Sequence, residues 1–266
     1  MTGYLFVNPN AGDGDGDALV AEAERRGVVT HVLSDGDDPV ELARSADATA
    51  LGVAGGDGSL AAVAAVAAAR DLPFVCVPAG TRNHFARDAG LDRDDPVTAL
   101  DAFVDGTELR IDLGRANDRP FLNNVSLGLY ATLVHRRERH RRRRDALARL
   151  RALGVVLAHR STDRFTVDGE AVDARVLLVA NNAYDLSMLS LGERPRLDEG
   201  RLHVYATHGL ARPSWQERGF ASLTVDAASG RVRAAVDGEP DVLETPIEFR
   251  VEPGALRLLV PRGPGA

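Results

Sequence analysis

The chain has 266 residues, of which 44% are apolar and 27% are charged, and its formal net charge is −7. This composition is typical of a folded globular protein of one or two domains and excludes a disordered chain. The longest unbroken apolar run, Leu60–Ala69, is far shorter than the roughly 20 residues of a membrane-spanning helix. No signal peptide is visible, and the single cysteine, Cys76, cannot form an internal disulfide. These features favour the cytoplasm.

Lysine is absent, because all 32 basic residues are arginine. P-loop NTPases and protein kinases place a lysine on the phosphates of their nucleotide, and pyridoxal phosphate enzymes need one for a Schiff base. The sequence therefore excludes these classes. Any phosphate group must be bound by backbone N–H groups, arginine and metal.

The first hundred residues alternate between strand-like and helix-like patterns. Strands are predicted at Tyr4–Asn8, Val28–Ser34, Ala48–Gly55 and Pro73–Gly80, and helices at Asp17–Gly27, Asp38–Ala46, Ser59–Arg70 and Asp95–Gly106. Gly27 is expected to end the first helix, and Pro39 lies in the first turn of the second. Such alternation predicts an α/β domain with a parallel sheet that has helices on both faces.

From about Glu108 onward the pattern changes to short β-type segments separated by turn residues. Strands are predicted at Leu109–Ala116, Pro120–Gly128, Asp163–Gly169, Ala174–Ala183, Arg201–Gly209, Phe220–Ser229, Arg231–Glu239, Ile247–Val251 and Ala255–Pro261. This half predicts a mainly β sandwich over residues 116–266, after a nucleotide-binding domain over residues 1–115. An alternative is that the last strands of this half pack back on the first domain.

A basic segment interrupts the β-rich half. A helix is predicted at Thr132–Leu157, and Arg136–Arg151 within it carries nine arginines and two carboxylates. Such a run suits anionic lipid headgroups or nucleic acid, or is a solvated helix face. No aromatic residue lies between these arginines, which disfavours single-stranded nucleic acid.

The stretch Gly55–Ser59, "GGDGS", lies where a predicted strand passes into a predicted helix. Glycines let the backbone approach a ligand closely, and the first N–H groups of a helix attract phosphate. Asp57 would repel a bare phosphate, but it fits if Mg²⁺ lies between them. The alternative is a tight turn in which Asp57 caps the following helix. As a loop carboxylate at a ligand site, Asp57 is expected to contribute little to packing.

Two further loops follow predicted strands, Asn8–Asp17 and Pro78–Asp88. Ligands of open parallel sheets bind beyond the carboxyl ends of the strands. We therefore expect the three loops to meet at one nucleotide-sized site.

The segments "FVNPNAG", "GGDGS" and "PAGTRNHFARDAGL", in this order, resemble the diacylglycerol kinase-like lipid kinases. This family includes bacterial diacylglycerol kinases and the sphingosine and ceramide kinases, with NAD kinases as distant relatives. In the second half, Asn123–Ala131, Arg194–Leu202 and Val236–Pro240 fall where the family has further signatures. The resemblance implies an NAD kinase-like first domain and a β-sandwich second domain.

The resemblance also implies roles for individual residues. Those implied to contact ATP are Asn8, Pro9, Asn10, Ala11, Gly12, Ser34, Gly55, Gly56, Asp57, Gly58, Ser59, Thr81, Arg82 and Asn83. Among them, Asp57 would hold Mg²⁺ through water, and Arg82 would be the basic group near the phosphates. A second metal would lie on the Glu199 carboxylate and the main-chain oxygens of Arg196 and Arg201. Ser59, His84 and Glu199 stand where many members have threonine, aspartate and aspartate.

Asp237 and Glu239 are implied as the catalytic carboxylates, one of which takes the proton of the lipid hydroxyl. The sequence "VDGE" occurs at both Val167–Glu170 and Val236–Glu239, and at least one copy is expected to be an ordinary hairpin turn. The later copy is followed by the segment typical of the family, which favours it as the catalytic one.

The expected function is an ATP- and Mg²⁺-dependent lipid kinase that converts diacylglycerol to phosphatidic acid. The alternatives are a kinase of another lipid alcohol (a sphingoid base, a ceramide or a polyprenol), an NAD kinase-like enzyme, and a non-catalytic lipid- or nucleotide-binding protein. The basic segment Arg136–Arg151 is expected to hold the enzyme on the inner face of an anionic membrane rather than on nucleic acid. The sequence leaves a homodimer open.

Overall fold

A computed structural model of the chain describes residues 2–9, 16–80, 83–128, 163–185, 192–207 and 215–262. These residues form two compact units. Unit 1 takes its residues from Met1–Leu113, Asn182–Gly200 and Glu252–Ala266, and unit 2 from Gly114–Asn181 and Arg201–Val251. The predicted basic helix at Thr132–Leu157 lies outside the described residues.

Unit 1 is built on a parallel sheet. Its strands are β1 (Gly3–Val7), β2 (Val29–Val32), β3 (Ala50–Gly55) and β4 (Phe74–Pro78), in the order β2-β1-β3-β4. β1 pairs in parallel with β2 and β3, and β3 pairs in parallel with β4. The last strand, β16 (Ile247–Pro261), adds Leu258 and Leu259 beside β4. The first residues of β16, up to Val251, belong to unit 2, where residues 247–250 pair with residues 222–225.

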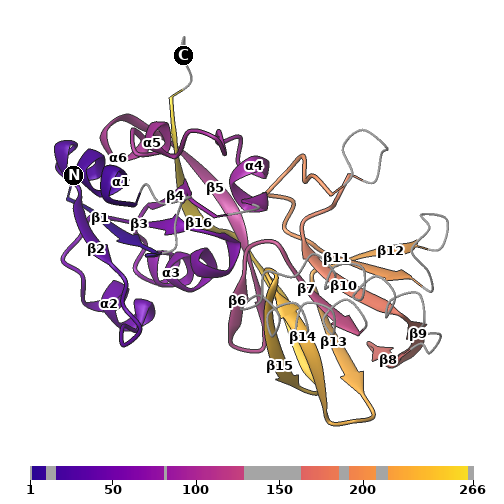
Figure 1. The fold of residues 1–266 in the computed structure, drawn as a ribbon. Coiled ribbons are helices and arrows are strands. Elements are labelled where there is room, and N and C mark those ends of the chain that lie inside the picture. The colour runs from indigo at the N-terminus through magenta and orange to yellow at the C-terminus, as the bar shows by residue number, and fades with distance from the viewer. Residues whose placement is uncertain are drawn as a thin grey trace, which may run out of the picture. The chain divides into compact units, whose positions relative to one another are not determined.

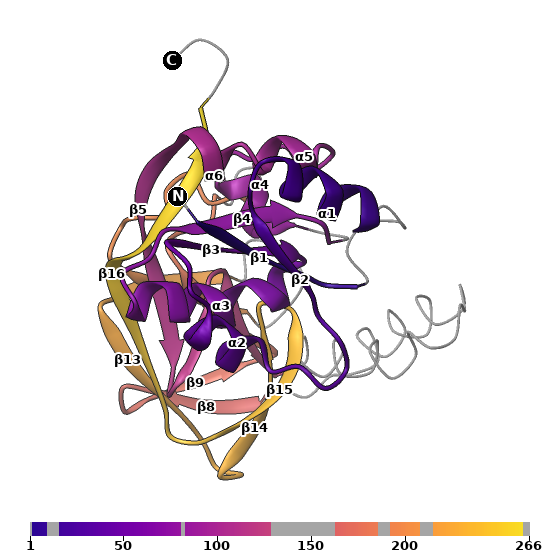
Figure 2. The ribbon, with the colours of Figure 1, turned by 90° about the vertical axis from the view of Figure 1, so that its left-hand side faces the viewer.

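Helices cover both faces of this sheet (Figures 1 and 2). α1 (Gly16–Arg25), α5 (Pro96–Ala99) and α6 (Ala102–Asp105) lie on one face. α2 (Pro39–Ser45) and α3 (Asp57–Ala69) lie on the other, and α4 (His84–Asp88) follows β4. Alternate strand residues bury against the two layers, so Leu5, Val75 and Val77 pack in one cluster with Leu19 and Phe103. The α/β prediction is confirmed.

Local signals placed these helices well, with two exceptions. Gly27 ends α1 with a φ of 75°, and Asp38 caps α2 by accepting the N–H groups of Val40 and Glu41. The single helix predicted at Asp95–Gly106 is two short ones, α5 and α6. It is interrupted because the N–H of Leu100 donates to Val97 O in an i→i+3 bond. α4 was not predicted, because its five residues carry no helical apolar pattern.

Unit 2 is a sandwich of antiparallel strands. After β5 (Gly106–Ala116), which spans both units, come β6 (Arg119–Phe121), β7 (Asn124–Gly128), β8 (Asp163–Val167), β9 (Glu170–Ala174), β10 (Val176–Asn181), β11 (Leu202–Thr207), β12 (Trp215–Phe220), β13 (Ser222–Ala227), β14 (Arg231–Val236) and β15 (Glu239–Glu244). One sheet has the order β12-β11-β10-β7-β14-β15. Its apolar face packs against β8, β13 and β16 in one core that includes Phe121, Phe165 and Phe249. The mainly β prediction for this half is confirmed.

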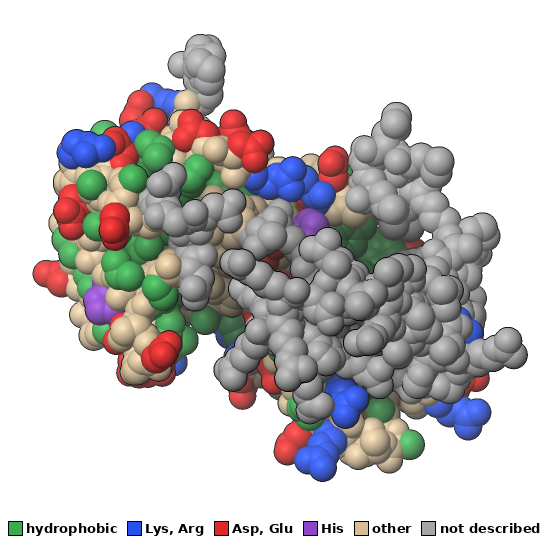
Figure 3. All heavy atoms as spheres, viewed as in Figure 1, with side chains coloured by type: hydrophobic (Ala, Val, Ile, Leu, Met, Phe, Trp, Pro, Cys, Tyr) green, Lys and Arg blue, Asp and Glu red, His purple; other side chains and the backbone are tan. Residues whose placement is uncertain are grey.

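The surface of unit 1 carries acidic side chains at several places on the face seen in Figure 3. This agrees with a chain whose negative charge lies outside Arg136–Arg151. None of the helices in the described part of the chain is long and apolar enough to cross a membrane.

Candidate active site

Three loops of unit 1 meet at the carboxyl edge of the parallel sheet. Asn8, directly after β1, donates from Nδ2 to the Oγ of Ser59 at 3.3 Å. Its backbone N–H donates to Ala54 O at 2.9 Å. A Cβ built on Gly80, in the loop after β4, would lie 2.4 Å from the Cα of Gly56. The second and third loops are therefore in backbone contact that only glycine permits, as the sequence led us to expect.

The helix that follows the second loop begins without a side-chain cap. Gly56 is the N-cap of α3, in extended conformation, and no side chain accepts a hydrogen bond there. α3 is 13 residues long, so its dipole adds to the attraction of its first N–H groups for an anion. The alternative in which Asp57 caps α3 is wrong, because Asp57 is the first residue of the helix rather than its cap.

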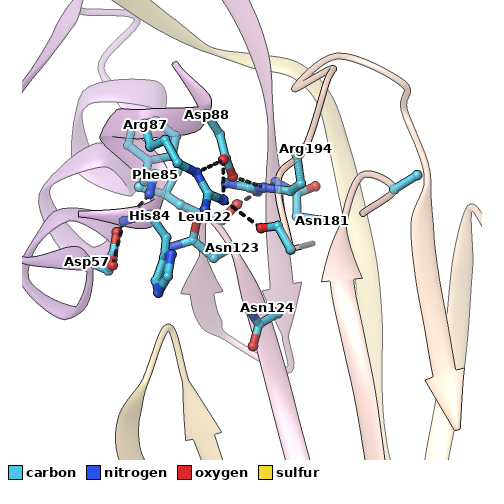
Figure 4. A network of polar contacts seen from close by, with 12 residues as sticks. Asp57, His84, Phe85, Arg87, Asp88, Leu122, Asn123, Asn124, Asn181 and Arg194 are labelled. Carbon is cyan, nitrogen blue, oxygen red and sulfur yellow. Dashed lines mark hydrogen bonds and ion pairs between the residues drawn. The ribbon is translucent and has the colours of Figure 1, made fainter. Parts of the chain in front are cut away.

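Asp57 instead binds the start of α4. Its Oδ1 accepts the N–H of Phe85 at 2.9 Å, and its Oδ2 accepts the N–H of His84 at 3.1 Å (Figure 4). The residue is only 8% exposed. The Asp57 side chain thus caps the start of α4. Asn83 is the N-cap residue of α4, but its own side chain makes no capping hydrogen bond to the helix. Asp57 joins the second loop to the element after the third.

Asn83 closes the third loop on itself. Its Oδ1 accepts the N–H of Gly80 at 2.9 Å, and its Nδ2 donates to the Gly80 carbonyl at 2.8 Å. Asn83 is buried and has a φ of 46°, a left-handed conformation that asparagine tolerates better than most residues. The next residue, His84, is exposed. Thr81 and Arg82, expected to contact the nucleotide, lie outside the described residues, as do Asn10, Ala11 and Gly12.

Ser34 lies apart from these contacts, at the end of the edge strand β2. Its N–H and its Oγ both donate to Asp37 Oδ2, at 2.8 and 3.0 Å, and His31 Nε2 lies 3.0 Å from the same oxygen. The imidazole of His31, followed by the Ser34 donors, lowers the pKa of Asp37 to about 2. Ser34 thus organises its own loop, and its role toward a nucleotide stays a prediction.

At the predicted second metal site, side chains accept hydrogen bonds from backbone N–H groups of unit 1. Glu199 Oε2 accepts the N–H of Ala183 at 2.9 Å, and the N–H of Glu199 donates to Asn182 Oδ1 at 2.8 Å. Arg196 pairs with Asp198 at 3.0 Å, while Arg201 belongs to unit 2. Across the described ranges, no group of three or more His, Cys, Asp or Glu side chains suits a metal ion. Metal binding at Glu199 stays a prediction.

Sequence reasoning missed Asp112, a buried acid on β5 that is only 2% exposed. Its Oδ2 accepts the N–H of Gly200 at 2.6 Å, and its Oδ1 accepts the N–H of Gly254 at 2.9 Å. The carboxylate therefore joins three segments of unit 1 that are distant in sequence. The signal in the sequence was the single aspartate between Ile and Leu in "RIDLG". An aspartate among apolar residues indicates a buried charge, and a buried charge needs a partner.

In unit 2, both "VDGE" copies form two-residue hairpins with the same turn. Asp168 and Asp237 have a φ of 47°, and Gly169 and Gly238 have a φ of 84°, as a type I′ turn requires. Asp237 is 8% exposed and accepts three backbone N–H groups, those of Leu122 (2.8 Å), Asn123 (2.7 Å) and Asn124 (3.0 Å). Glu239, the first residue of β15, is exposed. The turn therefore presents one saturated carboxylate and one accessible carboxylate.

Comparison with known proteins agrees with this geometry. Residues 2–116 match the model of the diacylglycerol kinase catalytic domain. A diacylglycerol kinase of Mycobacterium tuberculosis is 29% identical over 97% of this chain and 94% of its own length. A diacylglycerol kinase of Bacillus subtilis is 34% identical over 31% of this chain and 28% of its own length.

The fold is also found among solved structures. A putative diacylglycerol kinase from Bacillus anthracis superposes with a TM-score of 0.72 at 18% identity, over 97% of this chain and 96% of its own. A second one, with 18% identity and the same coverage, has a TM-score of 0.73. At this identity the likeness shows the fold alone. The catalytic-domain match over residues 2–116 and the relative aligned over 97% of the chain support a diacylglycerol kinase-like lipid kinase.

Proposed function

We propose that the chain transfers the γ-phosphate of ATP to a lipid hydroxyl, with diacylglycerol as the acceptor and phosphatidic acid as the product. The observation that carries this proposal is the contact of three loops at one sheet edge, through Asn8 with Ser59 and Gly56 with Gly80. It lies within residues 2–116, which match the diacylglycerol kinase catalytic domain. The named relatives supply the choice of acceptor.

The phosphates of ATP would bind the uncapped first turn of α3. Asp57 fits the role of magnesium holder. Each of its oxygens accepts one amide N–H, which leaves each a second lone pair for a metal-bound water. Mg²⁺ prefers such oxygen ligands. When bound there, Mg²⁺ would neutralise negative charge on the phosphates, which is the main requirement of phosphoryl transfer.

Glu239 is the better candidate for the general base. The carboxylate of Asp237 is buried and already accepts three N–H groups, so most of its lone pairs are used by the backbone. Glu239 is exposed on the same hairpin. As the lipid oxygen bonds to the γ-phosphorus, its proton passes to Glu239. The bond between the γ-phosphorus and the bridging oxygen breaks, and ADP leaves. Asp237 then holds the hairpin rather than the proton.

The test is to identify the phosphorylated product. The purified protein is incubated with γ-labelled ATP, Mg²⁺ and mixed micelles that contain diacylglycerol, sphingosine, ceramide, a polyprenol or NAD⁺ in separate reactions. We expect label in phosphatidic acid at a rate at least tenfold above the other acceptors. Label in another lipid would support the proposed lipid kinase activity but would replace diacylglycerol as its acceptor. Label in NAD⁺, or in no acceptor while ATP binds, would overturn the proposal.

We further propose that Arg136–Arg151, outside the described residues, attracts an anionic membrane surface. Each of its nine arginines would contribute roughly 1 kcal/mol of attraction near such a surface, and its two carboxylates would oppose it. Co-sedimentation with vesicles of phosphatidylglycerol or of phosphatidylcholine alone tests this at two salt concentrations. We expect salt-sensitive binding to the anionic vesicles, and equal binding to both would contradict the proposal.

A further inference from the structure

Arg194 carries a fully buried charge in unit 1. Its side chain is 0% exposed, and that of its partner Asp88 is 1% exposed, with Arg194 Nε 2.8 Å from Asp88 Oδ2 (Figure 4). The guanidinium carbon also lies 5.9 Å from the ring centre of Tyr184. Removing two charges from water costs several kcal/mol, so a buried pair stabilises weakly but can fix one arrangement of the groups it joins. We therefore expect Arg194 to fix the positions of the groups that it joins.

The pair belongs to a three-residue cluster that holds the end of α4. Arg87 Nη2 donates to Asp88 Oδ1 at 2.7 Å and to the carbonyl of Gly192 at 2.6 Å. Asp88 is thus held between one arginine of α4 and one from a segment about a hundred residues later. Together with Asp185, Glu193 and Pro195, this cluster lines a cavity of about 300 Å³. Both arginines of the cavity bind Asp88.

α4 needs such support. It has five residues, too few for a helix that is stable alone, and Asp88 is a negative charge at its C-terminal end, where the helix dipole disfavours one. Its first turn is fixed by Asp57 through the N–H groups of His84 and Phe85. Its last turn is fixed by Arg194 through Asp88. The helix is therefore held at both ends by groups outside it.

The position of α4 decides the position of the third loop. Asn83 precedes α4 directly, and its carbonyl accepts the N–H of Arg87. Its side chain binds both backbone groups of Gly80. Gly80 in turn lies against the backbone of Gly56. A shift of α4 would therefore move the third loop away from the second and would release Asp57.

We propose that Arg194, acting through Asp88, is a positioning residue of the nucleotide site: it fixes α4 and so holds Asp57 and the Gly80 loop in place for ATP. This inference rests on the proposed function, because it assumes that these loops bind the nucleotide. Arg194 touches no reacting atom. It acts through Asp88, α4 and Asn83 in sequence.

The test compares three substitutions in the full chain. Arg194→Met removes the charge and keeps much of the volume, and Arg194→Lys keeps the charge with a single point donor. Arg257→Met is the matched control, since Arg257 binds both oxygens of Glu108, at 3.0 and 2.8 Å, in the same unit and away from α4. Two quantities are measured without any lipid: amide hydrogen exchange at His84 and Phe85, and the Kd for a non-hydrolysable MgATP analogue. The KM values for ATP and for diacylglycerol follow.

For Arg194→Met we expect exchange at His84 and Phe85 to be at least tenfold faster and the Kd and KM for the nucleotide to rise at least tenfold. The KM for diacylglycerol should change less than twofold. Arg194→Lys should recover part of the nucleotide affinity, and Arg257→Met should match the wild type within twofold. A merely structural role would lower the folded fraction, and hence kcat, with both KM values unchanged; that result overturns the inference. So does an effect of Arg257→Met equal to that of Arg194→Met.

If Arg194→Met does not fold, Arg87→Gln serves in its place, since Arg87 is half-buried and binds the same carboxylate. Like Arg194→Met, Arg87→Gln should speed amide exchange at His84 and raise the Kd for the nucleotide. Unchanged exchange and an unchanged Kd overturn the inference. A wild-type chain that binds no MgATP would overturn the proposed function together with this inference. If the wild-type chain binds MgATP and the Arg194→Met variant binds it with equal affinity, this inference alone is overturned.

Discussion

Asp237 and Asp168 lie at the same position of two hairpins with the same four-residue sequence, yet Asp237 accepts three backbone N–H groups while Asp168 accepts one, from Thr224 at 2.7 Å. Asp237 is buried and Asp168 is exposed. The turn itself is the same, with matching φ values. The sequence of the turn therefore sets its backbone, and the surrounding chain decides what its carboxylate does.

This difference predicts unequal effects of the same substitution. Asparagine is a favoured residue in a type I′ turn, so neither Asp237→Asn nor Asp168→Asn should strain the backbone. At Asp237 the new amide NH₂ group would face N–H donors, and we expect a loss of about 3 kcal/mol in unfolding free energy. Asp168→Asn should cost less than about 1 kcal/mol, because its site is open to water. Urea unfolding followed by circular dichroism measures both, and equal losses would contradict the assignment.

The same pair of hairpins supplies a control for the proposed base. Glu239→Gln should lower kcat by a factor of about 10² to 10⁴, the usual contribution of a general base. Glu170→Gln, at the matching position of the other hairpin, removes only a surface ion pair with Arg218 and should leave kcat within twofold. Steady-state lipid phosphorylation at saturating ATP gives both values. A Glu239→Gln enzyme that works at the wild-type rate would exclude Glu239 as the base.

The contact between the second and third loops predicts the effect of one added methyl group. In Gly80→Ala the new Cβ would lie 2.4 Å from Gly56 Cα and 2.8 Å from Asn83 Oδ1, and backbone cannot yield without separating the loops. We expect a rise of at least tenfold in the Kd for MgATP. Gly36→Ala is the control, since nothing lies within 4 Å of its Cβ position. Calorimetric titration measures both, and unchanged affinity in Gly80→Ala would place the nucleotide elsewhere.

Much of unit 1 could be predicted from the sequence because its signals are local. Buried strands ending in glycine loops and a capping Asp38–Pro39 pair specify elements without knowledge of the rest of the chain. The convergence of the loops follows from parallel order alone. The partner of Asp57 could not be predicted, because His84 and Phe85 are 27 and 28 residues away and no periodicity links them. The expectation that Asp57 contributes little to packing missed these bonds.

In unit 2, β9, β12 and β15 were missed, and all three are edge strands in the sheet order. An edge strand is paired on one side and largely solvated, so its sequence need not alternate between apolar and polar residues. β15, "EPDVLE", shows this plainly, since only Leu243 among its residues is buried. The inner strands β10 and β14 were predicted, because burial imposes an apolar pattern on them.

The cluster of His31, Ser34 and Asp37 predicts a dependence of stability on acid pH. The His31 imidazole and then the Ser34 donors lower the pKa of Asp37 to about 2 from its ordinary value of 3.8. A lowered pKa in the folded state means that the contribution of Asp37 is complete above pH 3.8 and is lost as the pH falls through 2. The difference in urea midpoint between the wild type and Asp37→Asn should therefore shrink as the pH is lowered from 5 to 2. Asp35→Asn controls for the loss of one nearby charge. A wild-type advantage over Asp37→Asn that stays constant down to pH 2 would mean that these donors do not hold the carboxylate in its charged form.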